Sequence, residues 1–526
     1  MAIATGRTVR PEMTNDSYHR LEEKILERDQ VGASDIFYDL VRAGRPLPEL
    51  VGEIVRIHAP YTHVPYHQRL DDGVPRFVNN DHCLLSSRAS TELMALLRPE
   101  LAYLPLAQTI WYVPTGLDPW NQLLGKMPGH YVRLYELKFE GKPPLPEVHW
   151  AEQEPLAIDG AFPEKLNAWL TLVQRGEVVN AYRVFLGLWE EASQDGARRQ
   201  QLLAQLAFAG LIDVQDRVLH NRSYTTGHKS FRARATVQLA QAVGWENARS
   251  ILYAGVPDIA VGPRWYSTYE MACQIVQNLM DGRDRELLAN DKPLTPVESL
   301  ALVEALLSGE EPAHMTLIVA LLKNGAGLRQ IIDTIQLASA QLILETGNPN
   351  NYSIPQHSYE YCNTVRWFFD SFDHPHRLKL LFVAAAFVCR GAHNQRHTAE
   401  NGPIKIETPR GADTMPQHQM LERLDDALMG LRPFEAVNWT AAYLKAGLDR
   451  SALIDTLATA AAKTGNDPHN QELGSCLLED YAHSTARDRD RLLLASAKHT
   501  GGHRKYGDHM EAYRRFAEAF GLASGR

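Results

Sequence analysis

The feature that most constrains the fold of this chain is a helical pattern that repeats at intervals of roughly 110–125 residues. The segments that start at Leu302 and at Leu424 both show a helix, a break, a second helix that ends in Leu-Lys, and a glycine turn. Both continue with a third helical stretch, in which Asp333 and Asp455 correspond, and both close on Thr-Gly-Asn. A duplicated unit with helical periodicity throughout predicts an all-α fold.

Two further stretches match the same pattern more loosely. One begins at Ala181 and the other begins at Asp35, near the N-terminus. The unit is too long for a standard solenoid repeat and indicates duplicated modules of several helices. We therefore expect an all-α helical-repeat or multi-helix bundle of about four His-bearing modules, with short irregular or β excursions such as residues 130–139.

Two stretches that are rich in proline and glycine interrupt the helical pattern, because these residues break helices. They predict an N-terminal helical module with a His-rich segment at 1–140, a Pro-rich linker at 141–164, two central helical modules at 165–398, a loop at 399–417 and a C-terminal helical module at 418–526. No apolar run is long enough to span a bilayer, and the first residues show no secretory signal.

Composition excludes several classes of protein. The formal net charge is -9 and there is no basic block, so we expect no nucleic-acid partner. The five cysteines are far apart and form no CxxC motif, which argues against a disulfide framework, a zinc ribbon and an iron–sulfur cluster. Nucleotide-binding glycine motifs and the serine-hydrolase elbow are absent from the sequence. We expect a protein of the reducing cytoplasm, without a membrane partner.

Histidine is the unusual part of the composition, with 21 residues in the chain. In three copies of the repeat, His228, His357 and His503 occupy comparable places ahead of a helix. The first copy offers a denser run in a stretch that two prolines interrupt, which comprises His58, His63 and His67. We predict that these histidines converge from several modules on one metal, because neutral imidazole binds iron, copper and zinc well.

Other side chains near the histidines are candidates to complete such a site. The candidates for catalytic residues are Tyr61, Asp81 and Glu360. Further carboxylates that could bind or orient a ligand are Asp71, Asp72 and Glu479. The aromatic residues that we expect to line a pocket for an apolar substrate are Tyr61, Tyr66, Trp111, Tyr112 and Trp120.

The same histidines also have a purely structural interpretation, because an imidazole can cap a helix or pack between modules. Recurrence does not decide between the two, since a duplication also copies residues that only pack. For His374 and His376 we expect the structural role, at the start of a helix with Asp373 as its cap.

The segments around His228 and His357 resemble the questin oxidase-like family, whose members are α-helical and repeat-like. The matching pieces are GHKSFRARATVQLAQAVGW and HSYEYCNTVRWFFDSFDHPHRLKLLF, within residues 166–393. The resemblance implies an oxidative role on a small aromatic or polyketide-like molecule, with His228 and His357 as the family's histidines. The segments IHAPYTHVPYH and WYVPTGLDPWNQ match no pattern of that family.

These observations predict a metal-dependent, oxygenase-like oxidoreductase that acts on a small apolar or aromatic substrate. Iron is favoured over zinc, and a haem held non-covalently by a histidine stays open as a cofactor. The expected partners are the small-molecule substrate and a redox partner protein. Two alternatives remain: a zinc-dependent hydrolase or lyase that uses a zinc-activated water, and a non-enzymatic helical scaffold for a protein partner.

Overall fold

The computed structural model describes residues 11–61, 68–69, 75–76, 82–116, 123–124, 131–132, 150–214, 227–260, 266–279, 283–347, 353–396, 401–465, 468–502 and 508–522. The described chain is almost entirely helical, which confirms the predicted fold class. Two short antiparallel ladders interrupt the helices, formed by β1 (Gln68–Arg69) with β2 (Pro75–Arg76) and by β3 (Leu123–Leu124) with β4 (Tyr131–Val132). Within these ranges no helix combines the length and the apolar character needed to cross a bilayer.

Most of the helices form four consecutive groups of five, which we call modules 1 to 4. Module 1 comprises α1 (Pro11–Leu26), α2 (Gln30–Arg42), α3 (Leu47–His58), α4 (His82–Met94) and α5 (Leu104–Gly116). Module 2 comprises α6 (Phe162–Arg175), α7 (Val178–Glu191), α8 (Gly196–Ile212), α9 (His228–Val243) and α10 (Arg249–Ile259). Module 3 comprises α13 (Pro296–Leu307), α14 (Ala313–Lys323), α15 (Leu328–Glu345), α16 (Ser353–Ser371) and α17 (Arg377–Arg396). Module 4 comprises α18 (Gln417–Met429), α19 (Pro433–Lys445), α20 (Arg450–Lys463), α21 (Pro468–His483) and α22 (Asp490–Thr500).

The remaining helices lie between or after the modules. Between modules 2 and 3 are α11 (Ser267–Leu279) and α12 (Asp284–Leu287), and after module 4 comes α23 (Glu511–Ala519). Single 3-10 turns are η1 (Ala59–Tyr61), η2 (Pro99–Leu101), η4 (Trp150–Glu152), η5 (Trp245–Asn247) and η6 (Ala412–Thr414).

The order of packing is the same in every module. The first helix packs against the second, the third against the fourth, and the fourth against the fifth. This shared arrangement is what the internal duplication in the sequence predicts, because copies of one unit keep the same internal contacts.

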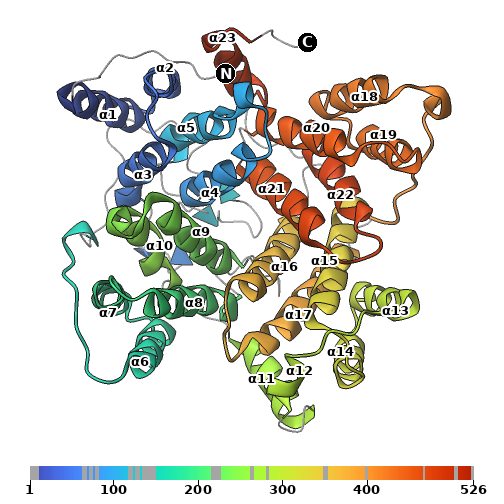
Figure 1. Ribbon diagram of the computed structural model, residues 1–526, viewed down its shortest axis with the longest axis horizontal. Helices are drawn as coiled ribbons and strands as arrows, with labels where there is room; N and C mark the ends of the chain where they lie inside the picture. The colour runs from blue at the N-terminus through green and yellow to red at the C-terminus, as the bar shows by residue number, and fades with distance from the viewer. Residues whose placement is uncertain are drawn as a thin grey trace.

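The four modules form a closed ring around a central axis (Figure 1). The third helix of each module packs against the fifth helix of the next: α3 against α10, α8 against α17, α15 against α22, and α20 against α5. The last of these contacts joins module 4 back to module 1. The fourth helices, α4, α9, α16 and α21, stand at the centre and contact one another in that order. We call them the inner helices.

The inner helices have almost no face toward solvent. In α9, Lys229, Arg232 and Arg234 are as buried as the apolar side chains around them. A charged group in such surroundings has to find a partner, since burial without one is costly. Accordingly, the Lys229 Nζ atom lies 2.5 Å from a carboxylate oxygen of Asp213, and Arg232 forms an ion pair with Asp258.

Glycines in the flanking helices let α9 approach them closely. A Cβ atom at Gly210 of α8 would lie 2.5 Å from the backbone oxygen of Lys229. A Cβ atom at Gly255 of α10 would overlap the side chain of Thr236. The helix that carries His228 is therefore held between its neighbours at a separation that only glycine permits.

We expect the substitution Gly210→Ala to lower the free energy of unfolding by about 1–3 kcal/mol, because the added methyl group overpacks the contact between α8 and α9. Gly196 is the matched control, since it lies in the same helix and has nothing within 4 Å of the position of its Cβ. Gly196→Ala should stabilise the protein by about 0.4–1 kcal/mol through the unfolded chain. Urea denaturation measures both effects, and equal effects would contradict the close approach of the two helices.

Candidate metal centre

Four histidines lie near the starts of the four inner helices. His82 opens α4, His228 opens α9, and His469 is the second residue of α21. His357 lies one turn into α16. All four are buried, with at most 5% of the residue exposed. Because the inner helices surround one axis, the shared position brings residues that are distant in sequence to the same level of the ring.

The four imidazoles follow one another around the axis in the order of the modules, and we call them the histidine ring. Two neighbouring pairs are close: the ring centroids are 4.7 Å apart for His82 and His469, and 4.8 Å apart for His228 and His357. The other two separations are wider, at 5.8 Å for His82 and His228, and 6.0 Å for His357 and His469. The histidine ring therefore consists of two close pairs.

Two glutamates add carboxylate donors beside this ring. Glu360 follows His357 by three residues, and Glu472 follows His469 by three residues. Residues with this spacing lie on the same face of a helix, so each glutamate shares the face of its histidine. A carboxylate oxygen of Glu472 lies 3.6 Å from Nδ1 of His82.

The distances fit the ligands of a transition-metal ion. Donor atoms of His82, His469 and Glu472 all lie within 4.8 Å of one another, and the described ranges hold no other such group of three. Three ligands on one face of an ion, with bonds of about 2.1 Å, are about 3.0–3.4 Å from one another, so these side chains would move closer together on binding one. The Nε2 atoms of His228 and His357 are 2.9 Å apart and share a hydrogen bond; adjacent ligands on a metal have a similar separation of about 3.0 Å.

A small cavity lies between the inner helices next to the histidine ring. Its lining consists of residues three to seven positions after each histidine, namely Leu85, Arg88, Phe231, Arg234, Glu360, Thr364, Glu472 and Cys476. Its volume of about 10 Å³ has room for about one water molecule. A water-sized ligand can therefore occupy it, whereas an organic substrate cannot.

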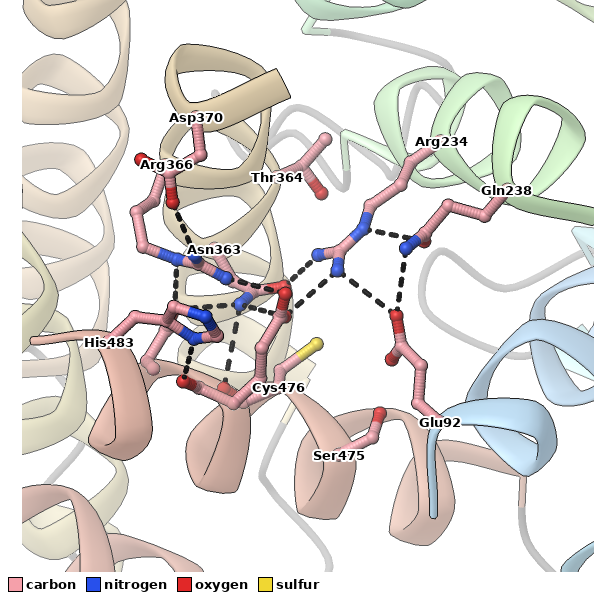
Figure 2. Close-up of polar contacts among 12 residues, drawn as sticks. Glu92, Arg234, Gln238, Asn363, Thr364, Arg366, Asp370, Ser475, Cys476 and His483 are labelled. Atoms are coloured by element: carbon pink, nitrogen blue, oxygen red, sulfur yellow. Dashed lines mark hydrogen bonds and ion pairs between the residues drawn. The ribbon is translucent and has the colours of Figure 1, made fainter. Parts of the chain in front are cut away.

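A network of charged side chains continues from the cavity along the inner helices (Figure 2). Arg234 donates to Glu479 at 2.8 Å and to Glu92 at 3.2 Å. Arg366 pairs with Glu479 and with Asp480, each at 2.6 Å. The amide of Asn363 donates to Glu479 at 3.0 Å and to Asp480 at 2.9 Å. We call this set the arginine–glutamate network, and it links all four inner helices.

Glu479 is the central anion of this network. Burial alone would raise the pKa of its carboxyl group, but the charges of Arg234 and Arg366 outweigh burial and hold that pKa well below its usual range. Glu479 is therefore ionised near neutral pH and compensates two arginines that have almost no contact with water. The network fixes the spacing of the helices that carry the histidine ring.

Only some of the site residues predicted from the sequence come together. His228 and His357 face each other, and Glu360 lines the cavity. His58 ends α3 and Tyr61 ends η1, both buried, and neither belongs to the compact group of three donors. The remaining candidates lie outside the described residues: His63, His67, Asp81 and His503.

The expected aromatic pocket is not assembled by the residues that can be placed. Trp111 and Tyr112 lie on α5, where Arg515 stands over the indole ring at 5.4 Å. Phe231 is the aromatic side chain that lines the cavity. Outside the described residues lie Tyr66, Asp71, Asp72 and Trp120. An aromatic substrate pocket therefore stays a prediction.

His374 precedes α17 and has a packing role. Its ring stacks on Phe208 with centroids 4.2 Å apart, and its Nε2 atom is 3.3 Å from the amide oxygen of Gln205. This agrees with the structural interpretation of the sequence. It makes His374 a suitable control for the buried histidines of the ring.

Three of the donors escaped the sequence analysis: His82, His469 and Glu472. His503 precedes the segment that contains α23, whereas the helix of module 4 that corresponds to α9 is α21. His469 therefore fills the position that His503 was expected to fill. The pattern His-x-x-Glu occurs at His357 and His469, but it also occurs at His19, His149 and His397, so it does not identify the site by itself.

Comparison with protein-family models, with curated proteins and with solved structures finds no match to this chain. The similarity to the questin oxidase-like family stays a hypothesis that rests on the segments around His228 and His357. The interpretation of the site depends on its own geometry.

We expect Glu479→Gln to lower the free energy of unfolding by about 2–4 kcal/mol, because it leaves Arg234 and Arg366 with less compensating charge in the interior. The control Asp490→Asn removes a carboxylate from an exposed pair with Arg450, 2.8 Å apart, and should cost about 0–1 kcal/mol. Urea denaturation at neutral pH measures both. Similar small losses in the two variants would show that the network adds little stability.

The same carboxylate predicts a dependence of stability on pH. The pKa of Glu479 is lower in the folded protein than its ordinary value of 4.5, so the folded state favours the ionised form. Its contribution is complete above the unfolded pKa and is lost as the pH falls through the lower folded pKa. Between neutral and acid pH the wild type should therefore lose more stability than Glu479→Gln. Parallel losses in the two proteins would refute this.

Proposed function

We propose that this protein is a metal-dependent, oxygenase-like oxidoreductase whose metal is held at the histidine ring. The observation that carries the proposal is the buried group of His82, His469 and Glu472, with donors within 4.8 Å of one another. Two histidines and one carboxylate are the ligand set of non-haem iron oxygenases, in which other positions on the metal stay open. Iron bound there would supply the redox chemistry with dioxygen, and we favour it over zinc.

The surroundings of these donors support such a role. Leu85 and Phe231 give the cavity apolar walls, and its volume of about 10 Å³ admits about one small molecule. A small site among buried helices limits the access of bulk water to reactive species. An organic substrate is too large for this cavity and would have to bind outside it.

Haem is not part of the proposal, because the close pairs of histidines leave no space for a porphyrin between their rings, with centroids only 4.7 and 4.8 Å apart. The substrate is a small apolar or aromatic molecule, as the resemblance to the questin oxidase-like family implies. We further propose that the enzyme works in the cytoplasm and receives electrons from a redox partner protein.

A zinc-dependent hydrolase or lyase is the second candidate. Two histidines and a glutamate also bind catalytic zinc in peptidases, with a water in the open position. The cavity beside Glu360 and Glu472 has room for one such water. The donor set is shared by both candidates, so the identity of the metal distinguishes them.

The test is elemental analysis of the full chain, expressed with iron and zinc supplied, together with oxygen uptake in the presence of a reductant. We expect about one equivalent of iron or more per chain and measurable oxygen consumption. His82→Ala and Glu472→Gln should each weaken metal binding at least tenfold, as the loss of a ligand does. His374→Gln is the control and should retain the metal, because His374 packs on Phe208.

Two results would overturn the proposal. Zinc as the bound metal, with no oxygen consumption, would favour the hydrolase or lyase. Less than about 0.2 equivalent of any transition metal would remove the metal site altogether. In that case, variants of the ring histidines that only lower stability would favour a helical scaffold.

A further inference from the structure

We propose that a groove between modules 3 and 4 is a second binding site, which takes a small apolar molecule with a carboxylate group. One wall of the groove belongs to module 3 and comes from α13, the turn before it and α15. The other wall belongs to module 4 and comes from the start of α22 and the connection that precedes it. The helix α13 lies on the outer side of α15 (Figure 1), so the groove is on the outside of the ring of modules.

The module 3 wall is apolar although it faces solvent. Leu294, Leu300 and Val303 line it from α13 and the turn before it, and Leu337 lines it from α15. Leu300 is 57% exposed, and Val297, one turn earlier, is 77% exposed. These two are the most exposed of the large hydrophobic side chains in the described part of the chain. Exposed apolar side chains beside a recess indicate a binding surface.

The repeat shows that the fold does not require apolar side chains at these positions. In the alignment of the repeats, Val297 and Leu300 of α13 correspond to Gln419 and Glu422 of α18, which are also exposed. Module 4 thus has polar side chains where module 3 has apolar ones. Since a helix with the same packing can carry polar residues here, the apolar face of α13 has a use other than folding.

The module 4 wall supplies positive charge. Arg487 is exposed and Arg491 is half-buried, and neither forms an ion pair with any residue that the structure describes. Arg450, by contrast, pairs with Asp490 at 2.8 Å. Asp488 is the one acidic side chain among the described lining residues, so the lining has a net positive charge. A guanidinium group beside an apolar wall suits a carboxylate on an apolar body, because its planar fork binds both carboxylate oxygens.

The size of the groove limits the ligand. Its volume is about 190 Å³, below the roughly 300–1,000 Å³ that is usual for sites of drug-sized ligands. A carboxylic acid with a short alkyl chain or a single ring fits such a volume. An α-helix of a partner protein, which is about 10 Å across, does not.

The groove is separate from the histidine ring. His469 lies near the start of α21, whereas the groove follows the end of this helix at His483, so about 20 Å of helix lies between the two sites. A ligand in the groove contacts modules 3 and 4 together, at a junction where Gln330 donates to Thr485 at 2.6 Å. Because only the folded ring assembles both walls, binding stabilises this junction.

The test is calorimetric titration of the full chain with octanoate and with benzoate, and 1-octanol is the control that lacks the carboxylate. We expect one octanoate per chain, a higher Tm in its presence, and binding of 1-octanol that is weaker by about tenfold or more. Arg491→Gln and Leu300→Glu should each weaken octanoate binding by about tenfold or more. The first removes a charge-assisted hydrogen bond, and the second places a negative charge beside the carboxylate. Arg423→Gln changes an exposed arginine outside the groove and should bind octanoate like the wild type.

Four results would overturn this inference. They are octanoate binding that neither Arg491→Gln nor Leu300→Glu weakens, equal affinities for octanoate and 1-octanol, and no binding of either acid by the folded wild type. The fourth is binding that His82→Ala abolishes while the groove variants retain it, which would place octanoate at the histidine ring. Circular dichroism checks that every variant is folded.

Discussion

Each inner helix is enclosed by its own module and by its neighbours in the ring, and this enclosure determines how its polar side chains can behave. A helix without a solvent face cannot hydrate its charges, so they bind one another or a ligand. In the arginine–glutamate network the charges bind one another, as in the ion pair between Arg234 of module 2 and Glu479 of module 4. In the histidine ring the side chains are donors that suit a metal. Both lie on the axis because four equivalent helices meet there.

The sequence predicted the architecture better than the site, for a physical reason. Helical periodicity and duplication follow from local spacing, which is visible in one chain. Equivalent positions of the repeat can nevertheless have different surroundings. Asp333 is buried and accepts a hydrogen bond from the backbone N–H of Thr485 at 2.7 Å, whereas the side chain of the matching Asp455 is 41% exposed. His228 and His357 could be predicted because the segments that surround them are similar to each other in sequence. His82 was missed because the residues around it do not resemble those around His228 and His357, and its partners come from helices hundreds of residues away.

Duplication also explains why the site is asymmetric. The ring offers four equivalent positions, and all four carry histidine. Three residues later the modules differ, with Leu85 and Phe231 in two helices and Glu360 and Glu472 in the others. At this position the four inner helices therefore present two neighbouring apolar side chains and two neighbouring carboxylates. Such divergence at one position changes chemistry without disturbing the packing of the modules.

The closure of the ring has a consequence for how the protein assembles. Module 1 and module 4 meet through Ser90, whose hydroxyl donates to Gln471 at 2.8 Å across 381 positions of the chain, and through Gln108, which donates to Ala462 in α20. His82 and His469 come from the same two modules. An ion bound between them would connect module 1 to module 4, and so close the longest loop of the chain. Closing a long loop costs entropy, and a ligand that binds only the closed form offsets that cost. The pair His228 and His357 can form earlier, because modules 2 and 3 are consecutive in the chain.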